Sequence, residues 1–231
     1  MQTSDLVLVR GLADTRATLA AWNRRPGSVV GRWAAGALAI SLLLLGAVWL
    51  VAALSTPDPA PRLLGFYDNP TLGHVQEVLG RNSLVLALHA FACIAGFIAG
   101  SSLPTEAERY SGRWRWIHDK AGPLAIAFVV GATLFSLVTQ ALVLGQGASS
   151  LAALMDTSPG MLLLVLLPHA LPELVALFLP LAAWMIASRR RDWHELLAAT
   201  LITVALAVPV LIAAAFVEVY VTPGLLRSLA G

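Results

Sequence analysis

Residues 33–54 read WAAGALAISLLLLGAVWLVAAL, a run without a single charged side chain. A helix needs about 20 such residues to cross the roughly 30 Å hydrocarbon core of a bilayer. Four more apolar runs follow, at residues 83–101, 122–144, 161–187 and 196–221. The runs are continuously apolar rather than alternating, and lipid offers the backbone no hydrogen-bond partners. They therefore predict spanning helices and not membrane strands.

The composition of the whole chain agrees with this prediction. Hydrophobic residues make up 58% of the 231 and charged residues only 12%. A soluble domain carries about twice that share of charge, so this chain needs lipid as its solvent. A net charge of +2 gives no reason to expect a nucleic-acid partner. We therefore predict an all-α, polytopic transmembrane helical bundle of about five spanning helices in the cell (inner) membrane, with the lipid bilayer as its first partner.

The basic residues predict how the helices are oriented. Twelve of the 15 Lys and Arg residues fall in the N-terminal arm and in the second and fourth connections. Because basic connections stay in the cytoplasm, the N-terminus is predicted to be cytoplasmic and the C-terminus to lie outside. The predicted organisation is a cytoplasmic arm at residues 1–32, a transmembrane domain at 33–225 and a short tail at 226–231.

Two connecting segments carry patterns of their own. In residues 4–22, Leu8, Leu12 and Leu19 fall near one helical face, which is typical of an amphipathic helix on the inner surface or of a polar tail with a few leucines. The second segment precedes residue 83, and its apolar side chains also share a helix face. They predict a segment on the outer membrane surface: Leu72, Val75, Val78 and Leu79.

Ionisable side chains inside the predicted spans are the candidate site. His169 and Glu173 are four residues apart and share one face of the fourth helix. Three prolines in that helix, at positions 168, 172 and 180, predict a kink or a break. The predicted topology gathers the remaining polar side chains in the outer half of the membrane, with Glu173 nearer the middle: Asn82, His89, Gln140, His169 and Glu218.

Two interpretations of these polar residues stay open. A network of His169, Glu173 and Glu218 between the fourth and fifth helices could hold the helices together, or it could line a functional pocket. His89 would complete a set of zinc-ligand types, but the sequence has no HExxH motif, and we predict no metal and no cofactor. We expect no catalytic residues. Gly96 and Gly100, four apart in the second helix, predict a close helix contact.

Three stretches of the chain resemble the stage II sporulation protein M family. They are the Asn-led second helix at residues 82–91, the segment His169-Ala-Leu-Pro-Glu173-Leu, and the segment Ala214-Ala-Phe-Val-Glu218-Val-Tyr-Val-Thr222-Pro223. Ala170 stands where the family usually has glycine. The resemblance implies a membrane protein that anchors or localises cell-envelope enzymes.

The function expected from residues and resemblance together is a non-enzymatic membrane scaffold. It would recruit or organise other membrane or cell-envelope proteins and could form a homo-oligomer. The alternative is a transporter or permease subunit with a polar site around His169, Glu173 and Glu218, because a proline-rich helix with a midplane carboxylate is typical of substrate sites. An intramembrane hydrolase is the third possibility.

Overall fold

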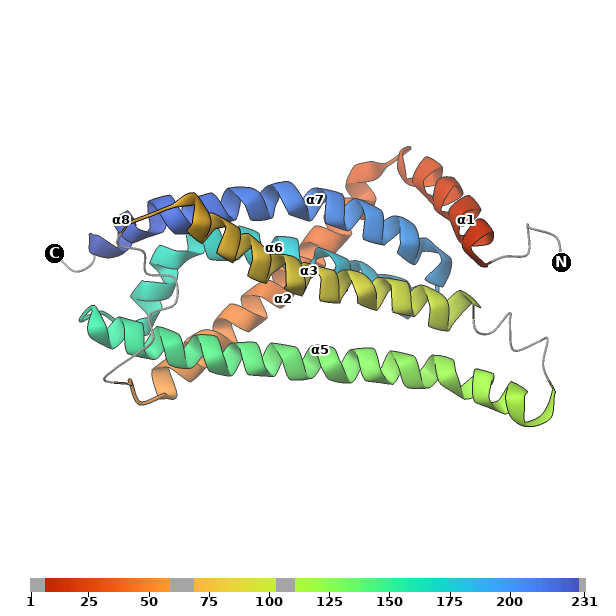
Figure 1. Ribbon diagram of the computed structural model, residues 1–231, viewed down its shortest axis with the longest axis horizontal. Coiled ribbons are helices and arrows are strands. Elements are labelled where there is room, and N and C mark those ends of the chain that lie inside the picture. Colours follow the sequence, from red (N-terminus) through yellow and green to blue (C-terminus); the bar gives the residue numbers. More distant parts are fainter. Residues whose placement is uncertain (1–6, 59–68, 103–110, 229–231) are drawn as a thin grey trace. The chain divides into compact units, whose positions relative to one another are not determined.

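The computed structural model describes residues 7–58, 69–102 and 111–228, and within these ranges the regular structure is helical without strands. The elements are α1 (Val7–Trp22), α2 (Pro26–Leu54), α3 (Leu72–Phe97), the π-helix η2 (Ile98–Ser102), α5 (Gly112–Leu154), α6 (Pro159–Arg190), the 3₁₀-helix η3 (Trp193–Glu195), α7 (Leu196–Phe216), the π-helix η4 (Val217–Val221) and α8 (Thr222–Arg227). The α-helices are labelled in Figure 1.

The predicted helical class and the count of five spans are confirmed. In the described part of the chain, five segments are long and apolar enough to cross a membrane: Pro26–Leu54, Leu72–Gly100, Gly112–Leu154, Pro159–Arg190 and Trp193–Arg227. The cytoplasmic N-terminus stays a prediction, because no membrane is present to orient the helices. Some residues behind the predictions lie outside the described ranges. They are residues 4–6 of the N-terminal amphipathic segment, Arg62 and Arg109 from the count of basic residues, and residues 229–231 of the C-terminal tail.

The helices extend beyond the apolar runs that predicted them. At 43 residues, α5 is the longest. With a rise of 1.5 Å per residue it measures about 64 Å, roughly twice the hydrocarbon thickness. The predicted run at 122–144 is only its middle. Of the kink or break predicted for the fourth spanning helix, the break is wrong, because α6 is continuous from Pro159 to Arg190 and contains all three prolines. The kink stays a prediction.

The predicted surface segment before residue 83 is also part of a long helix. Its residues form the first turns of α3, which begins at Leu72. Val75 and Val78 are buried against Ala215 of α7 and Val219 of η4. Leu79 packs against the same cluster, whereas Leu72 is 63% exposed, so three of the four predicted residues pack on other helices of the chain.

The chain divides into two compact units, and each long helix contributes residues to both. Unit 1 comprises Met1–Ala37, Val85–Ala132 and Leu177–Ala207, and unit 2 comprises Leu38–Leu84, Thr133–Ala176 and Val208–Gly231. The candidate site residues can therefore be assigned to one unit or the other.

In unit 1, glycines of α3 and η2 lie against tryptophans. A Cβ added at Gly96 would come within 2.7 Å of Nε1 of Trp184, and one at Gly100 within 2.1 Å of Cγ of Trp193. Only a residue without a side chain leaves room for the indole rings at these points. The two glycines thus lie against side chains of the same chain, and the close approach of helix backbones stays a prediction.

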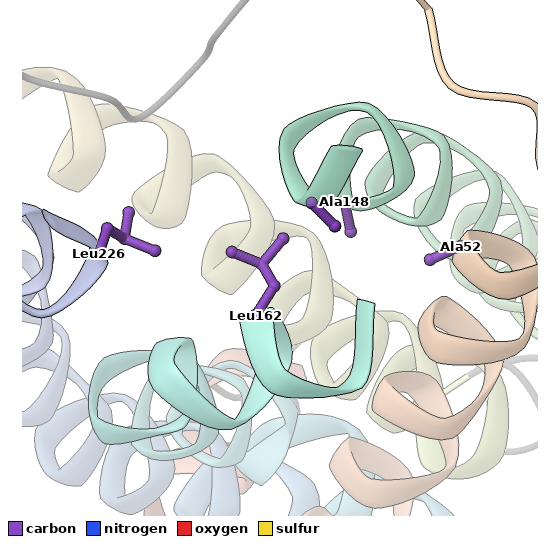
Figure 2. Close-up of a cluster of buried hydrophobic side chains, with 5 residues drawn as sticks. Ala52, Ala148, Leu162 and Leu226 are labelled. Atoms are coloured by element: carbon purple, nitrogen blue, oxygen red, sulfur yellow. The ribbon is translucent and has the colours of Figure 1, made fainter. Parts of the chain in front are cut away.

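In unit 2, small residues bring the end of α5 close to the end of α2. A Cβ added at Gly145 would lie 2.5 Å from Cβ of Val51 and 2.9 Å from the carbonyl oxygen of Val48. The Ser149 hydroxyl donates a hydrogen bond to the carbonyl of Ser55 at 3.1 Å. Figure 2 shows the apolar cluster that completes this region, in which Leu162 of α6 lies among side chains of α2, α5 and α8: Ala52, Ala148, Ala152 and Leu226.

Candidate functional site

Six polar side chains of unit 2, some buried and some partly exposed, come from three parts of the chain. Arg81 and Asn82 lie on α3, His169 and Glu173 on α6, and Glu218 and Thr222 on η4 and the first residue of α8. We call these six residues the polar cluster. All belong to unit 2, and four of them were predicted as site residues: Asn82, His169, Glu173 and Glu218.

His169 is held by Thr222. Its Nδ1 lies 2.9 Å from Oγ1 of Thr222, and both residues are buried. The same hydroxyl lies 3.2 Å from the carbonyl oxygen of Val217, five residues earlier. A carbonyl only accepts, so when Thr222 donates to Val217 its oxygen accepts a hydrogen from His169 Nδ1. This arrangement fixes the histidine ring against η4.

Glu218 carries the ion pair of the cluster. One of its carboxylate oxygens lies 3.7 Å from a guanidinium nitrogen of Arg81, and the two side chains are 15% and 47% exposed. Glu218 sits inside the π-helix η4. Single π-helical turns within longer helices are frequent at functional sites, because the extra residue changes which side chains face inward.

Glu173 and Asn82 supply the unpaired groups of the cluster. Oε2 of Glu173 and Nδ2 of Asn82 are shielded from solvent and make no hydrogen bond with any residue described here. Asn82 nevertheless lies close enough to Glu173 to act on its carboxyl group as a hydrogen-bond donor, and Arg81 and Glu218 act on the same group through their charges. A buried donor or acceptor left unpaired costs about 1–3 kcal/mol. The amide donor of Asn82 and the carboxyl oxygen of Glu173 are thus near enough to pair with each other, or each could bind a further polar group.

Two predicted site residues make other contacts. His89 belongs to unit 1, where its Nδ1 lies 2.9 Å from the carbonyl oxygen of Leu177. Since a carbonyl only accepts, Nδ1 carries the hydrogen. Gln140 donates from Nε2 to the Ser136 hydroxyl at 2.9 Å, one turn away on α5. These contacts connect neither residue to the polar cluster.

Sequence reasoning missed two members of the cluster. Arg81 was counted only among the basic residues of the connections, for the prediction of orientation. Its position beside Asn82 nevertheless places both residues at the same end of the second spanning helix. Thr222 entered only as part of the third family-like segment. In the described ranges, no three His, Cys, Asp or Glu side chains are grouped as metal ligands would be.

Comparison with known proteins gives a family for the chain. No curated protein and no solved structure matches it. A family model described as stage II sporulation protein M matches residues 37–223, a range that contains all six residues of the polar cluster. The match covers most of the 231 residues and runs from α2 to the start of α8. This multi-pass membrane protein belongs to the stage II sporulation protein M family.

Proposed function

We propose that the protein is a non-enzymatic scaffold of the cell (inner) membrane that recruits or organises cell-envelope proteins through α5. The observation that carries the proposal is how little of α5 the chain itself covers. Only 6% of its most apolar stretch is buried, against 28–39% for the other four spanning segments. A helix that packs so little on its own chain has most of its surface available to another protein.

The exposed side chains of α5 are large and apolar. Phe128 and Phe135 are each 75% exposed, and Leu124 is 68% exposed. At its start the helix adds Trp116, which is 63% exposed. Aromatic side chains contribute strongly to protein interfaces, since they bury much area with few rotatable bonds.

Site-specific photo-cross-linking in the native membrane tests this proposal. A photoreactive phenylalanine analogue replaces Phe128 or Phe135, one per variant. We expect both positions to capture the same cell-envelope protein. The matched control is Leu43 of α2, which is also 75% exposed and should capture only lipid. Equal protein capture from Leu43, or none from either phenylalanine, would contradict the scaffold proposal.

A permease subunit is the second candidate, favoured by the unpaired Asn82 and Glu173 atoms beside a π-helix. Accessibility to a charged thiol reagent separates it from the scaffold. Cys93 is the sole cysteine, so a Cys93→Ser background allows Glu173→Cys to be labelled alone. Labelling from the aqueous phase would indicate a water path to the cluster and favour transport. A cysteine that stays unlabelled in the folded protein would favour the scaffold.

A further inference from the structure

Unit 1 contains an apolar groove where the end of α1 meets the start of α2. Its volume is about 440 Å³, and its apolar lining includes Leu19, Trp22, Val29, Val30, Trp33 and Ile202. Ligand sites in proteins commonly have volumes of about 300–1,000 Å³. The groove therefore has the size and lining of a site for a hydrocarbon group.

Two tryptophans form one wall of the groove. The rings of Trp22 and Trp33 pack edge to face, with centroids 5.1 Å apart. Trp33 is 5% exposed and anchors the wall, while Trp22 is only partly buried. Tryptophan is enriched at membrane interfaces because its ring is apolar and its N–H can bond to lipid polar groups.

Exposed cations stand at the rim of the groove. Asn23 lines it, and Arg24 and Arg25 follow directly in the turn between α1 and α2. Both arginines are exposed, as is Arg16 on α1. The acidic residue of α1 is Asp14, which lies more than two helical turns before the loop that joins α1 to α2. The rim thus carries positive charge beside an apolar cavity.

We propose that this groove binds an anionic phospholipid, with an acyl chain along the tryptophan wall and the phosphate against Arg24 and Arg25. Guanidinium groups bind phosphate oxygens through paired, charge-assisted hydrogen bonds. Basic residues next to the cytoplasmic end of a spanning helix attract anionic headgroups. The lipid would tie α1 to α2 at the predicted cytoplasmic surface, far in sequence from the polar cluster and independent of the scaffold role.

Lipid retention by the purified full chain tests the proposal. The protein is reconstituted in vesicles of phosphatidylcholine and phosphatidylglycerol, extracted, and examined by native mass spectrometry for bound lipid. We expect phosphatidylglycerol to be retained in preference to phosphatidylcholine. The double variant Arg24→Gln/Arg25→Gln should weaken that retention roughly 10- to 30-fold, since each arginine near an anionic surface contributes about 1 kcal/mol.

Two further variants distinguish lipid binding in the groove from a general attraction of anionic lipid to exposed arginines. Ala20→Trp fills the groove from an exposed position and should also abolish retention, although both arginines remain. Arg189→Gln/Arg190→Gln removes two exposed arginines at the end of α6 and should retain lipid as the unmodified chain does. Equal loss in this control, unchanged retention in the rim variant, or displacement of the lipid by millimolar inorganic phosphate would overturn the proposal.

Discussion

The two units bury their polar side chains in different ways. In unit 1, His89 and Cys93 of α3 each contact a backbone carbonyl of α6, at 2.9 Å from Leu177 and 3.2 Å from Pro180. In unit 2, the Ser149 hydroxyl also bonds to a carbonyl, that of Ser55, but two further polar contacts join side chains: His169 contacts Thr222, and Glu218 contacts Arg81.

The unpaired atoms differ as well. Among the described residues, Nε1 of Trp184 and Oγ of Ser188 in unit 1 have no hydrogen-bond partner, and both groups are neutral. Unit 2 leaves Nδ2 of Asn82 and an oxygen of the Glu173 carboxyl group. A carboxyl group in lipid costs more to bury than an indole or a hydroxyl, so it is more often associated with function. The position of a polar residue in the sequence of a spanning helix does not show whether its role is structural or functional.

We expect the largest effect on stability from replacing a glycine in each unit. Gly145→Ala should destabilise the protein by about 2 kcal/mol, because the new Cβ would meet the β-branched Val51 and the backbone of Val48, neither of which can move easily. Gly96→Ala should cost less, since its three nearest atoms all belong to the side chains of Trp184 and Leu196 and none to the backbone. Unfolding by denaturant in bicelles gives the free energies.

Gly147 is the matched control for this pair. It lies in the same helix as Gly145, but a Cβ there would meet nothing within 4 Å. Gly147→Ala should therefore stabilise α5 by up to about 1 kcal/mol through helix propensity. If Gly145→Ala and Gly147→Ala changed stability equally, the close approach of α2 and α5 would be wrong.

Two buried threonines provide the next test. Thr222→Val removes the partner of His169 and should cost about 1–2 kcal/mol. Thr203→Val should be nearly neutral, because the Thr203 hydroxyl bonds only to carbonyls of its own helix, at 2.7 and 3.2 Å. Thr222→Ser, which keeps the hydroxyl, should recover most of the loss. Similar costs for both valine variants would mean that the contact of His169 with Thr222 contributes nothing.

The ion pair of unit 2 should have the smallest effect. A double-mutant cycle of Arg81→Gln and Glu218→Gln should give a coupling energy of about 0.2–1 kcal/mol, because Arg81 is half exposed and the charges are 3.7 Å apart. Raising the salt concentration should reduce the coupling if water reaches the pair. A coupling well above this range would indicate that the pair is closed off from water.

Much of the fold followed from composition and periodicity. Lipid removes every backbone arrangement except helices and closed barrels, so five long apolar runs fixed both the class and the number of spans. The ends of the helices were harder to predict. A segment with good helix propensity can continue as a helix into the membrane–water interface, where the hydropathy of the sequence falls. This is why α5 extends to Gly112 and Leu154 and α3 begins at Leu72.

The candidate site was predictable in its residue types and less so in its contacts. The cost of burying ionisable groups pointed to His169, Glu173 and Glu218. The predicted topology placed His169 and Glu218 in the outer half of the membrane and Glu173 nearer the middle. Their partners depend on side-chain direction, which helix periodicity gives only while the helix remains regular. The π-helix η4 interrupts that regularity, so Thr222 could not be matched to His169 from spacing alone.

The extra residue in η4 has an evolutionary consequence. Each residue of an α-helix turns the chain by about 100°, so one inserted position rotates all later side chains by about that angle. Thr222 and Leu226 come after η4, and both are buried. A relative that lacked this single residue would direct both side chains elsewhere, losing the histidine contact and a member of the cluster in Figure 2 together. Gaps of one residue at 217–221 should therefore be rare among sequences that keep His169 and Thr222.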